Sequence, residues 1–231
     1  GVRGRWAYAW LLSGAATAFH PLVGGWMMIS IAFVALIQSI KRRDQIDWLN
    51  LCALACVIAG LAVALYGVWP AMQMSSGVAA DICEEAAAIY VVDRLPHHLL
   101  PSSFQESLVT RHLLAVIFCG VLYAALPSGS RRQRGLMMVL AAVLISCSGF
   151  VISLCEQIAP YFTYGLLRFY WFRLADGLVP LGLCVLLTHF LFRTPSSPFG
   201  ELLRSRRSCL VALILCLFAY DSVLQSRHWP L

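Results

Sequence analysis

Long apolar segments alternate with short polar segments along the whole chain. A helix needs roughly 20 predominantly apolar residues to cross a hydrocarbon core, and several segments reach this length without a formal charge. We predict seven spans, over residues 6–19, 21–40, 48–69, 107–126, 135–155, 174–192 and 208–224. The pattern therefore predicts an all-α fold, a polytopic transmembrane helical bundle.

The first predicted span is short and runs directly into His20 and Pro21. The chain also begins at Gly1 rather than at a methionine. We therefore expect residues 1–231 to form a single integral membrane domain that is a processed chain or part of a longer membrane protein with further helices.

The same first segment has one alternative interpretation, a signal peptide, because Arg3 and Arg5 precede an apolar run. Trp6, Tyr8 and Trp10 favour an aromatic belt at the membrane interface instead, and no small-residue cleavage site follows. We therefore interpret the segment as a span.

The composition agrees with a membrane protein. Hydrophobic residues make up 60% of the chain and charged residues 12%, whereas charged residues make up about 25% of an ordinary soluble domain. A soluble globular domain is therefore excluded as the general class.

The cations fall on one side of the predicted topology. Residues 41–45 (K-R-R-D-Q), 128–134 (S-G-S-R-R-Q-R) and 193–207 connect spans on the same side, and the positive-inside rule places that side in the cytoplasm. Residues 70–106 and 156–173 are then extracytoplasmic. Topology and lipid headgroups account for the net charge of +6, so we expect a multi-pass cell-membrane protein that does not bind nucleic acid.

The long outer connection contains a predicted interfacial helix over residues 77–94, which is rich in alanine. Its acidic residues lie near the start and Arg94 at the end, which suits the helix dipole. Ser75 or Ser76 is a suitable N-cap. We expect this helix to lie on or near the membrane surface.

Pro96 then ends the helix, because a proline disfavours helical geometry in the residue before it. His97 and His98 should therefore lie in an irregular turn. Ser103 and Glu106 form a capping-box pattern that should start the next span.

Three interpretations of this turn stay open. Asp93 with His97 or His98, helped by Glu84 or Glu85, offers metal-ligand types, but adjacent histidines do not match a zinc motif, and we predict no metal site. A turn that merely contacts water and headgroups is the second interpretation. The third is a site for a lipid phosphate or another anion, formed by Arg94, His97, His98, Arg111 and His112.

Two further outer segments carry candidate residues. His20 lies between two spans, and Gly24 and Gly25 permit close approach of a backbone or a ligand; a tight helical hairpin is the plain alternative to a functional His20. An aromatic belt at the outer interface is the plain alternative for the aromatic segment 168–180 and the preceding residues 155–164. Within 168–180, Arg173 and Asp176 form an i, i+3 pair on a helix. An acid at the mouth of a span needs such a partner or an aqueous cavity.

The remaining patterns predict little chemistry. Cys83 and Cys155 are the two cysteines placed toward the outer side, where a disulfide is an open alternative. No nucleotide-binding loop or nucleophile elbow occurs in the sequence. We therefore predict no cofactor.

Three motifs carry a resemblance to a known family. F-H-P-L-V-G-G-W at 19–26, R-L-P-H-H-L-L-P at 94–101 and F-Y-W-F-R-L-A-D-G-L-V-P-L at 169–181 resemble a family of bacterial polytopic membrane proteins known as a domain of unknown function. The resemblance covers most of the chain. It implies a bacterial inner-membrane protein and supplies no activity.

The layout of short basic loops and polar outer loops is also similar to the GT-C glycosyltransferases, which use polyprenyl-phosphate sugar donors. Those enzymes usually carry an acidic catalytic residue in the first outer loop, where this chain has His20. This similarity concerns architecture alone.

The working hypothesis is a transferase-like protein that uses a lipid-linked donor at the outer face, with the lipid bilayer and a polyprenyl-phosphate lipid as partners. Asp176 or His20 would be catalytic by orienting a reacting group. The substrate-binding residues would be Arg94, His97, His98, Arg111, Arg168 and Arg173, with cations stabilising the leaving phosphate. A membrane transporter and a non-catalytic membrane scaffold are the alternatives.

Overall fold

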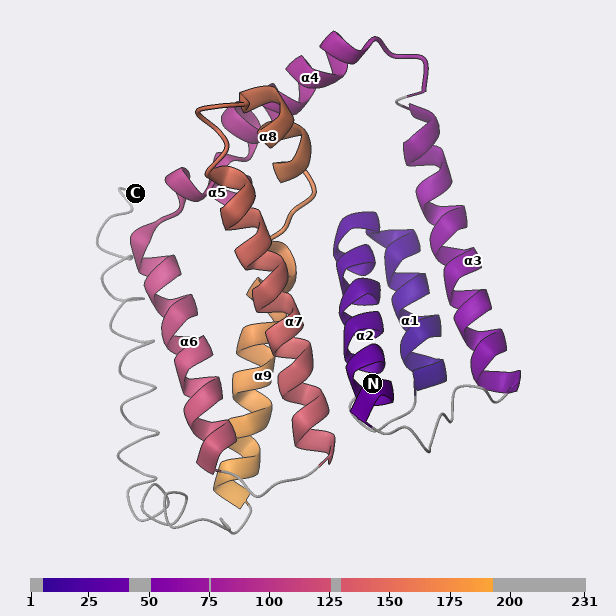
Figure 1. Ribbon diagram of the computed structural model, residues 1–231, viewed down its shortest axis with the longest axis vertical. Coiled ribbons are helices and arrows are strands. Elements are labelled where there is room, and N and C mark those ends of the chain that lie inside the picture. The colour runs from indigo at the N-terminus through magenta and orange to yellow at the C-terminus, as the bar shows by residue number, and fades with distance from the viewer. Residues whose placement is uncertain (1–5, 42–50, 75, 126–129, 193–231) are drawn as a thin grey trace, which may run out of the picture.

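The computed structural model describes residues 6–41, 51–74, 76–125 and 130–192, and this part of the chain contains helices joined by turns, with no strand (Figure 1). The helices are α1 (Trp6–Phe19), α2 (Pro21–Lys41), α3 (Leu51–Met74), α4 (Ala80–Ala88), α5 (Pro96–Leu99), α6 (Glu106–Ala125), α7 (Ser130–Ser153), α8 (Pro160–Leu167) and α9 (Arg173–Phe192). A π-helical segment, Ile89–Arg94, continues α4, and a 3₁₀ turn, Pro101–Ser103, follows α5. The all-α fold class is confirmed.

Five helices of the described part are long and apolar enough to cross a membrane: α2, α3, α6, α7 and α9. They match five of the predicted spans. The first predicted span forms α1, whose 14 residues extend for about 21 Å, less than a hydrocarbon core of about 30 Å. The span predicted over 208–224 lies outside the described residues.

The long helices form two groups that stand side by side (Figure 1). One group contains α1, α2 and α3, and the other contains α6, α7 and α9. Helix α2 packs on α7 and joins the groups. Helices α4, α5 and α8 lie at one end, at the top of Figure 1, and the helix ends that lead into the basic loops lie at the other.

Small residues bring the first three helices together. A Cβ on Gly14 of α1 would collide with the backbone of Gly60 in α3, and a Cβ on Gly67 would collide with Ala18. Such small-residue contacts let helix backbones approach closely in membranes, where van der Waals packing drives association.

The second group has a larger apolar core. Leu122 of α6, Ala142 of α7 and Val179 of α9 are fully buried in it. Helix α3, by contrast, turns most of its apolar side chains outward, as expected for a helix in contact with lipid.

The capping predictions around the outer segments were wrong. Ala79 is the N-cap of α4 and makes no side-chain hydrogen bond, while the Ser76 hydroxyl donates to the carbonyl of Gln73 instead. Ser103 belongs to the 3₁₀ turn, and α6 begins only at Glu106. Pro101 begins a 3₁₀ turn that includes Ser103. Ser103 is therefore not at the N-cap position of α6 that a capping box requires.

Pro96 does end the preceding helix, since Leu95 leaves the helical region with φ −136° and ψ 40°. The predicted irregular turn at His97 and His98 was wrong, because both residues belong to α5, a single helical turn. Proline favours the first position of a helix, so Pro96 both ends one helix and begins the next.

Candidate functional site

A small second core holds the α4–α8 end of the molecule together. Val91 and Leu99, on the two sides of Pro96, are fully buried there with Leu167 of α8. The hydroxyls of Tyr90 and Tyr170 lie 2.7 Å apart and share a hydrogen bond. The π-helical segment and the connection between α8 and α9 therefore form one packed unit.

The π-helix is the local feature that places Tyr90 and Arg94. Leu95 donates its N–H to the carbonyl of Tyr90, five residues earlier, at 3.1 Å. Single π turns are frequent at functional sites.

Two indole hydrogen bonds hold the connection between α8 and α9, residues 168–172, in place. The indole N–H of Trp26 in α2 donates to the carbonyl of Phe169 at 2.6 Å, and that of Trp171 donates to Leu166 at 2.7 Å. Tyr170 has a φ of 57°, which is rare for a bulky residue and costs of order 1–3 kcal/mol. The hydroxyl bond to Tyr90 and these indole bonds hold it there.

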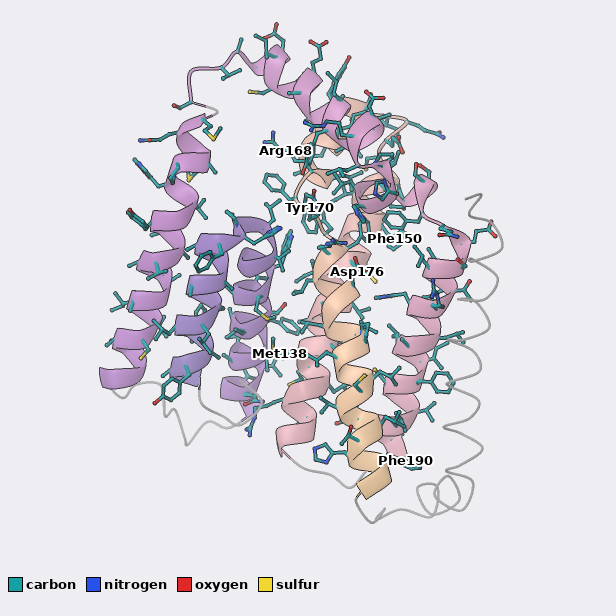
Figure 2. The ribbon with its side chains drawn as sticks, turned by 180° about the vertical axis from the view of Figure 1, so that it is seen from behind. Met138, Phe150, Arg168, Tyr170, Asp176 and Phe190 are labelled. Carbon is teal, nitrogen blue, oxygen red and sulfur yellow. The ribbon has the colours of Figure 1, made fainter. Side chains whose placement is uncertain are left out.

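A pocket of about 520 Å³ opens between α2, the α4 and π-helical segments, and the start of this connection. Its wall is largely apolar, and its cations are Arg94 and Arg168. Figure 2 shows Arg168 and Tyr170 at this end of the molecule. The lining residues are Leu22, Ala86, Ala87, Ile89, Tyr90, Arg94, Arg168 and Phe169.

The pocket is electrostatically positive. Its lining contains two guanidinium groups and no carboxylate, and within the described ranges neither arginine forms an ion pair. The Arg168 guanidinium lies 5.2 Å from the centre of the Phe169 ring. Burial and the bond to Tyr170 raise the pKa of Tyr90 to about 12, so its hydroxyl stays neutral.

A second group of polar side chains lies apart from this lining, where α5, α6 and α9 meet. Arg173 and Asp176 form an ion pair at 3.7 Å, as predicted, and both side chains are about half exposed. His98 and His112 act electrostatically on Asp176. The His97 and His98 rings lie against each other, with centres 4.2 Å apart and planes inclined by 47°.

Partial burial lowers the pKa of His98. The neighbouring positive charges of His97 and Arg173 lower it further, and Asp176 opposes the shift.

The structure thus divides the predicted site residues. Arg94 and Arg168 line the pocket, whereas His98, Arg173 and Asp176 belong to the second group. Arg111 is half-buried on α6 beside His112.

His20 is exposed between α1 and α2, where its Nδ1 accepts a 3.4 Å hydrogen bond from the Val23 N–H and caps α2. A Cβ on Gly24 would collide with Thr17 and Ala16 of α1, whereas Gly25 faces open space. The tight hairpin considered for this segment is therefore present.

Sequence reasoning missed Tyr90, Tyr170 and Trp26, which shape the pocket or its support. Tyrosine and tryptophan near a membrane end are expected in an aromatic belt. An aromatic belt does not predict the specific hydrogen bonds that these three side chains make.

Two alternatives considered from the sequence, a metal site at the turn and a Cys83–Cys155 disulfide, are not found among the described residues. The described histidines, cysteines and acids form no group of three or more suited to hold a metal ion. Cys83 and Cys155 are both free thiols.

Comparisons of the chain with protein-family models, with curated proteins and with solved structures find no match. The functional argument therefore depends on the residues and their geometry.

Proposed function

We propose that this multi-pass membrane protein binds the phosphate-bearing headgroup of an anionic lipid in the pocket formed by α2, α4, the π-helical segment and the α8–α9 connection. The observation that supports this proposal is the convergence of Arg94 and Arg168 on an apolar-walled pocket without a carboxylate.

The residue types suit this ligand. Guanidinium groups bind phosphate through paired, charge-assisted hydrogen bonds. Apolar side chains such as Leu22, Ile89 and Phe169 suit the first part of a lipid chain, and pockets of about 300–1,000 Å³ are typical of small-ligand sites. A lipid would thus place its charge on the arginines and its chain along the apolar wall.

The position in the bundle agrees with a headgroup site. The pocket lies at the end where α2 and α6 begin and α3 and α7 end, which corresponds to the interface. The basic loops belong to the opposite end, so the positive-inside rule assigns the pocket to the extracytoplasmic face.

The layout similar to the GT-C glycosyltransferases adds the proposal that the lipid is a polyprenyl-phosphate donor for a transferase. His20 and Asp176 stay the predicted catalytic residues for such a reaction. Neither residue lines the pocket, so lipid binding is the function that the geometry supports best.

Native mass spectrometry of the gently solubilised protein tests this proposal. We expect a phosphate-bearing lipid to stay bound to the wild type, and Arg94→Gln or Arg168→Gln to reduce retention about tenfold, because each removes a charge-assisted contact. Arg173→Gln and His98→Gln, which change the second group, should retain the lipid.

Two outcomes would contradict the proposal. If the lipid is lost from Arg173→Gln and His98→Gln but not from the pocket variants, the second group is the binding site. If no phosphate-bearing lipid is retained by the wild type, the scaffold and transporter alternatives become the better explanations.

A further inference from the structure

The pocket has few polar groups, and two of them are cationic. Its polar side chains are Tyr90, Arg94 and Arg168, and the rest of the lining consists of alanine, leucine, isoleucine and phenylalanine. Two fixed positive charges therefore face the ligand, and arginine does not lose its charge at any ordinary pH.

We infer that the pocket selects a lipid phosphomonoester, whose terminal phosphate is not esterified to a second alcohol, over lipids whose phosphate is a diester. This inference depends on the proposed lipid-binding function and specifies its ligand.

Charge favours the monoester. A phosphomonoester carries about −1.5 to −2 charges near neutral pH and has three terminal oxygens, whereas a diester carries a single charge. Arg94 and Arg168 come from two different segments, so each can donate to a different terminal oxygen. A monoester satisfies both guanidinium groups, and a diester leaves one of them less completely neutralised.

The lining also disfavours larger headgroups. A glycerol or a sugar attached to the phosphate brings several hydroxyls, and each hydroxyl that contacts the apolar wall without a hydrogen-bond partner costs free energy. Apart from Tyr90 and the two arginines, no side chain of the lining offers a hydrogen bond. A choline or ethanolamine headgroup would bring a cation beside two guanidinium groups with no carboxylate to receive it.

Tyr90 completes the set of donors. The Tyr90 and Tyr170 hydroxyls share one hydrogen bond at 2.7 Å, so when Tyr170 donates, the Tyr90 O–H is free to donate to a phosphate oxygen. The lining then presents donors and no fixed acceptor charge, which suits a group that only accepts hydrogen bonds.

Competition binding to the full chain in nanodiscs tests the inference, read by native mass spectrometry. The probes with matched acyl chains are phosphatidic acid, phosphatidylglycerol and phosphatidylcholine, and a second pair is a polyprenyl monophosphate and the same lipid carrying a hexose. We expect each monoester to be retained about tenfold more than its diester, which corresponds to the gain of one charge-assisted contact. The two monoesters distinguish a glycerolipid from a polyprenyl ligand.

Variants connect the preference to the pocket. Arg94→Gln and Arg168→Gln should each reduce the monoester preference to about twofold or less, and Arg94→Lys, which keeps the charge but loses the planar fork, should give an intermediate value. Because both arginine side chains are exposed, these variants should keep the elution volume of the wild type in size-exclusion chromatography.

The outcomes separate the two proposals. If phosphatidylglycerol or the hexose-bearing lipid is retained as well as its monoester, and retention still requires the arginines, the inference is overturned and the proposed lipid binding stands. If retention of every lipid is unaffected by the arginine variants, both are overturned.

Discussion

His98 lies in the single turn of α5 and is half-buried beside His97. Its pKa is below the ordinary value of 6.5, chiefly because of burial. Above that value both the folded and unfolded states hold a neutral imidazole. As the pH falls below 6.5, His98 takes up a proton in the unfolded state before it does so in the folded state. The folded state therefore loses stability until the pH is low enough to protonate His98 in the folded state as well.

We therefore expect the thermal unfolding midpoint to fall between about pH 7.5 and about pH 5, and His98→Gln to reduce this fall. His189→Gln, which removes an exposed histidine near the opposite end of the bundle, is the matched control and should keep the wild-type slope. An identical slope in His98→Gln and the wild type would contradict the argument.

The residue types of the candidate site could be read from the sequence, but their grouping could not. Arg94 and His98 are four residues apart and invite assignment to one site. Leu95 leaves the helical region between them, so Arg94 faces the pocket and His98 joins Asp176. The pairing of Arg94 with Arg168 depends on the packing of α8 on α4, which no local pattern predicts.

Two adjacent glycines in α2 have different surroundings. Gly24 packs directly on the backbone of α1, where a Cβ would approach Thr17 more closely than 3.0 Å. Gly25 has no heavy atom within 4 Å of where its Cβ would lie. One position therefore requires glycine for packing, and the other does not.

We expect Gly24→Ala to lower the free energy of unfolding by about 1–3 kcal/mol, because the added methyl group forces α1 and α2 apart. Gly25→Ala is the control and should be neutral or stabilising by up to about 1 kcal/mol, since alanine is the better helix former. Thermal unfolding in detergent measures both. Equal effects of the two substitutions would show that the α1–α2 contact does not need Gly24.

The length and continuous apolar character of the long helices made them predictable, because a helix that crosses a hydrocarbon core needs both. The interfacial helix over 77–94 was predicted as a helix, but its last six residues, Ile89–Arg94, are π-helical. This departure arises from packing, since fully buried Val91 and the Tyr90–Tyr170 bond anchor the segment to residues far along the chain. Helix α8 was missed because its aromatic residues matched an interfacial belt.

The pocket lies between α2 of the first helix group and the α4–α8 end of the molecule, close to the start of α9 in the second group. Leu22 belongs to the first group, and Phe169 precedes α9 of the second. Trp26 connects the groups twice, through its 2.6 Å hydrogen bond to the Phe169 carbonyl and through its ring, which lies 4.5 Å from that of Trp171. The shape of the pocket should therefore depend on how the groups are held together.

Trp26→Phe tests this dependence. Phenylalanine keeps an aromatic ring beside Trp171 but cannot donate to the Phe169 carbonyl, so we expect a loss of about 1 kcal/mol in the free energy of unfolding. Because Phe169 and the adjacent Arg168 form one wall of the pocket, lipid retention should fall together with stability. Thermal unfolding and native mass spectrometry measure the two effects on the same samples.

The control for this prediction is Trp69→Phe, which changes an exposed tryptophan on α3 that does not line the pocket. Substitutions at such exposed positions usually change stability by less than about 0.5 kcal/mol, and lipid retention should stay at the wild-type level. If Trp26→Phe loses stability but keeps full retention, the two helix groups hold the pocket independently of this bond. If Trp26→Phe loses stability and lipid retention while Trp69→Phe loses neither, the contact between the helix groups shapes the lipid site.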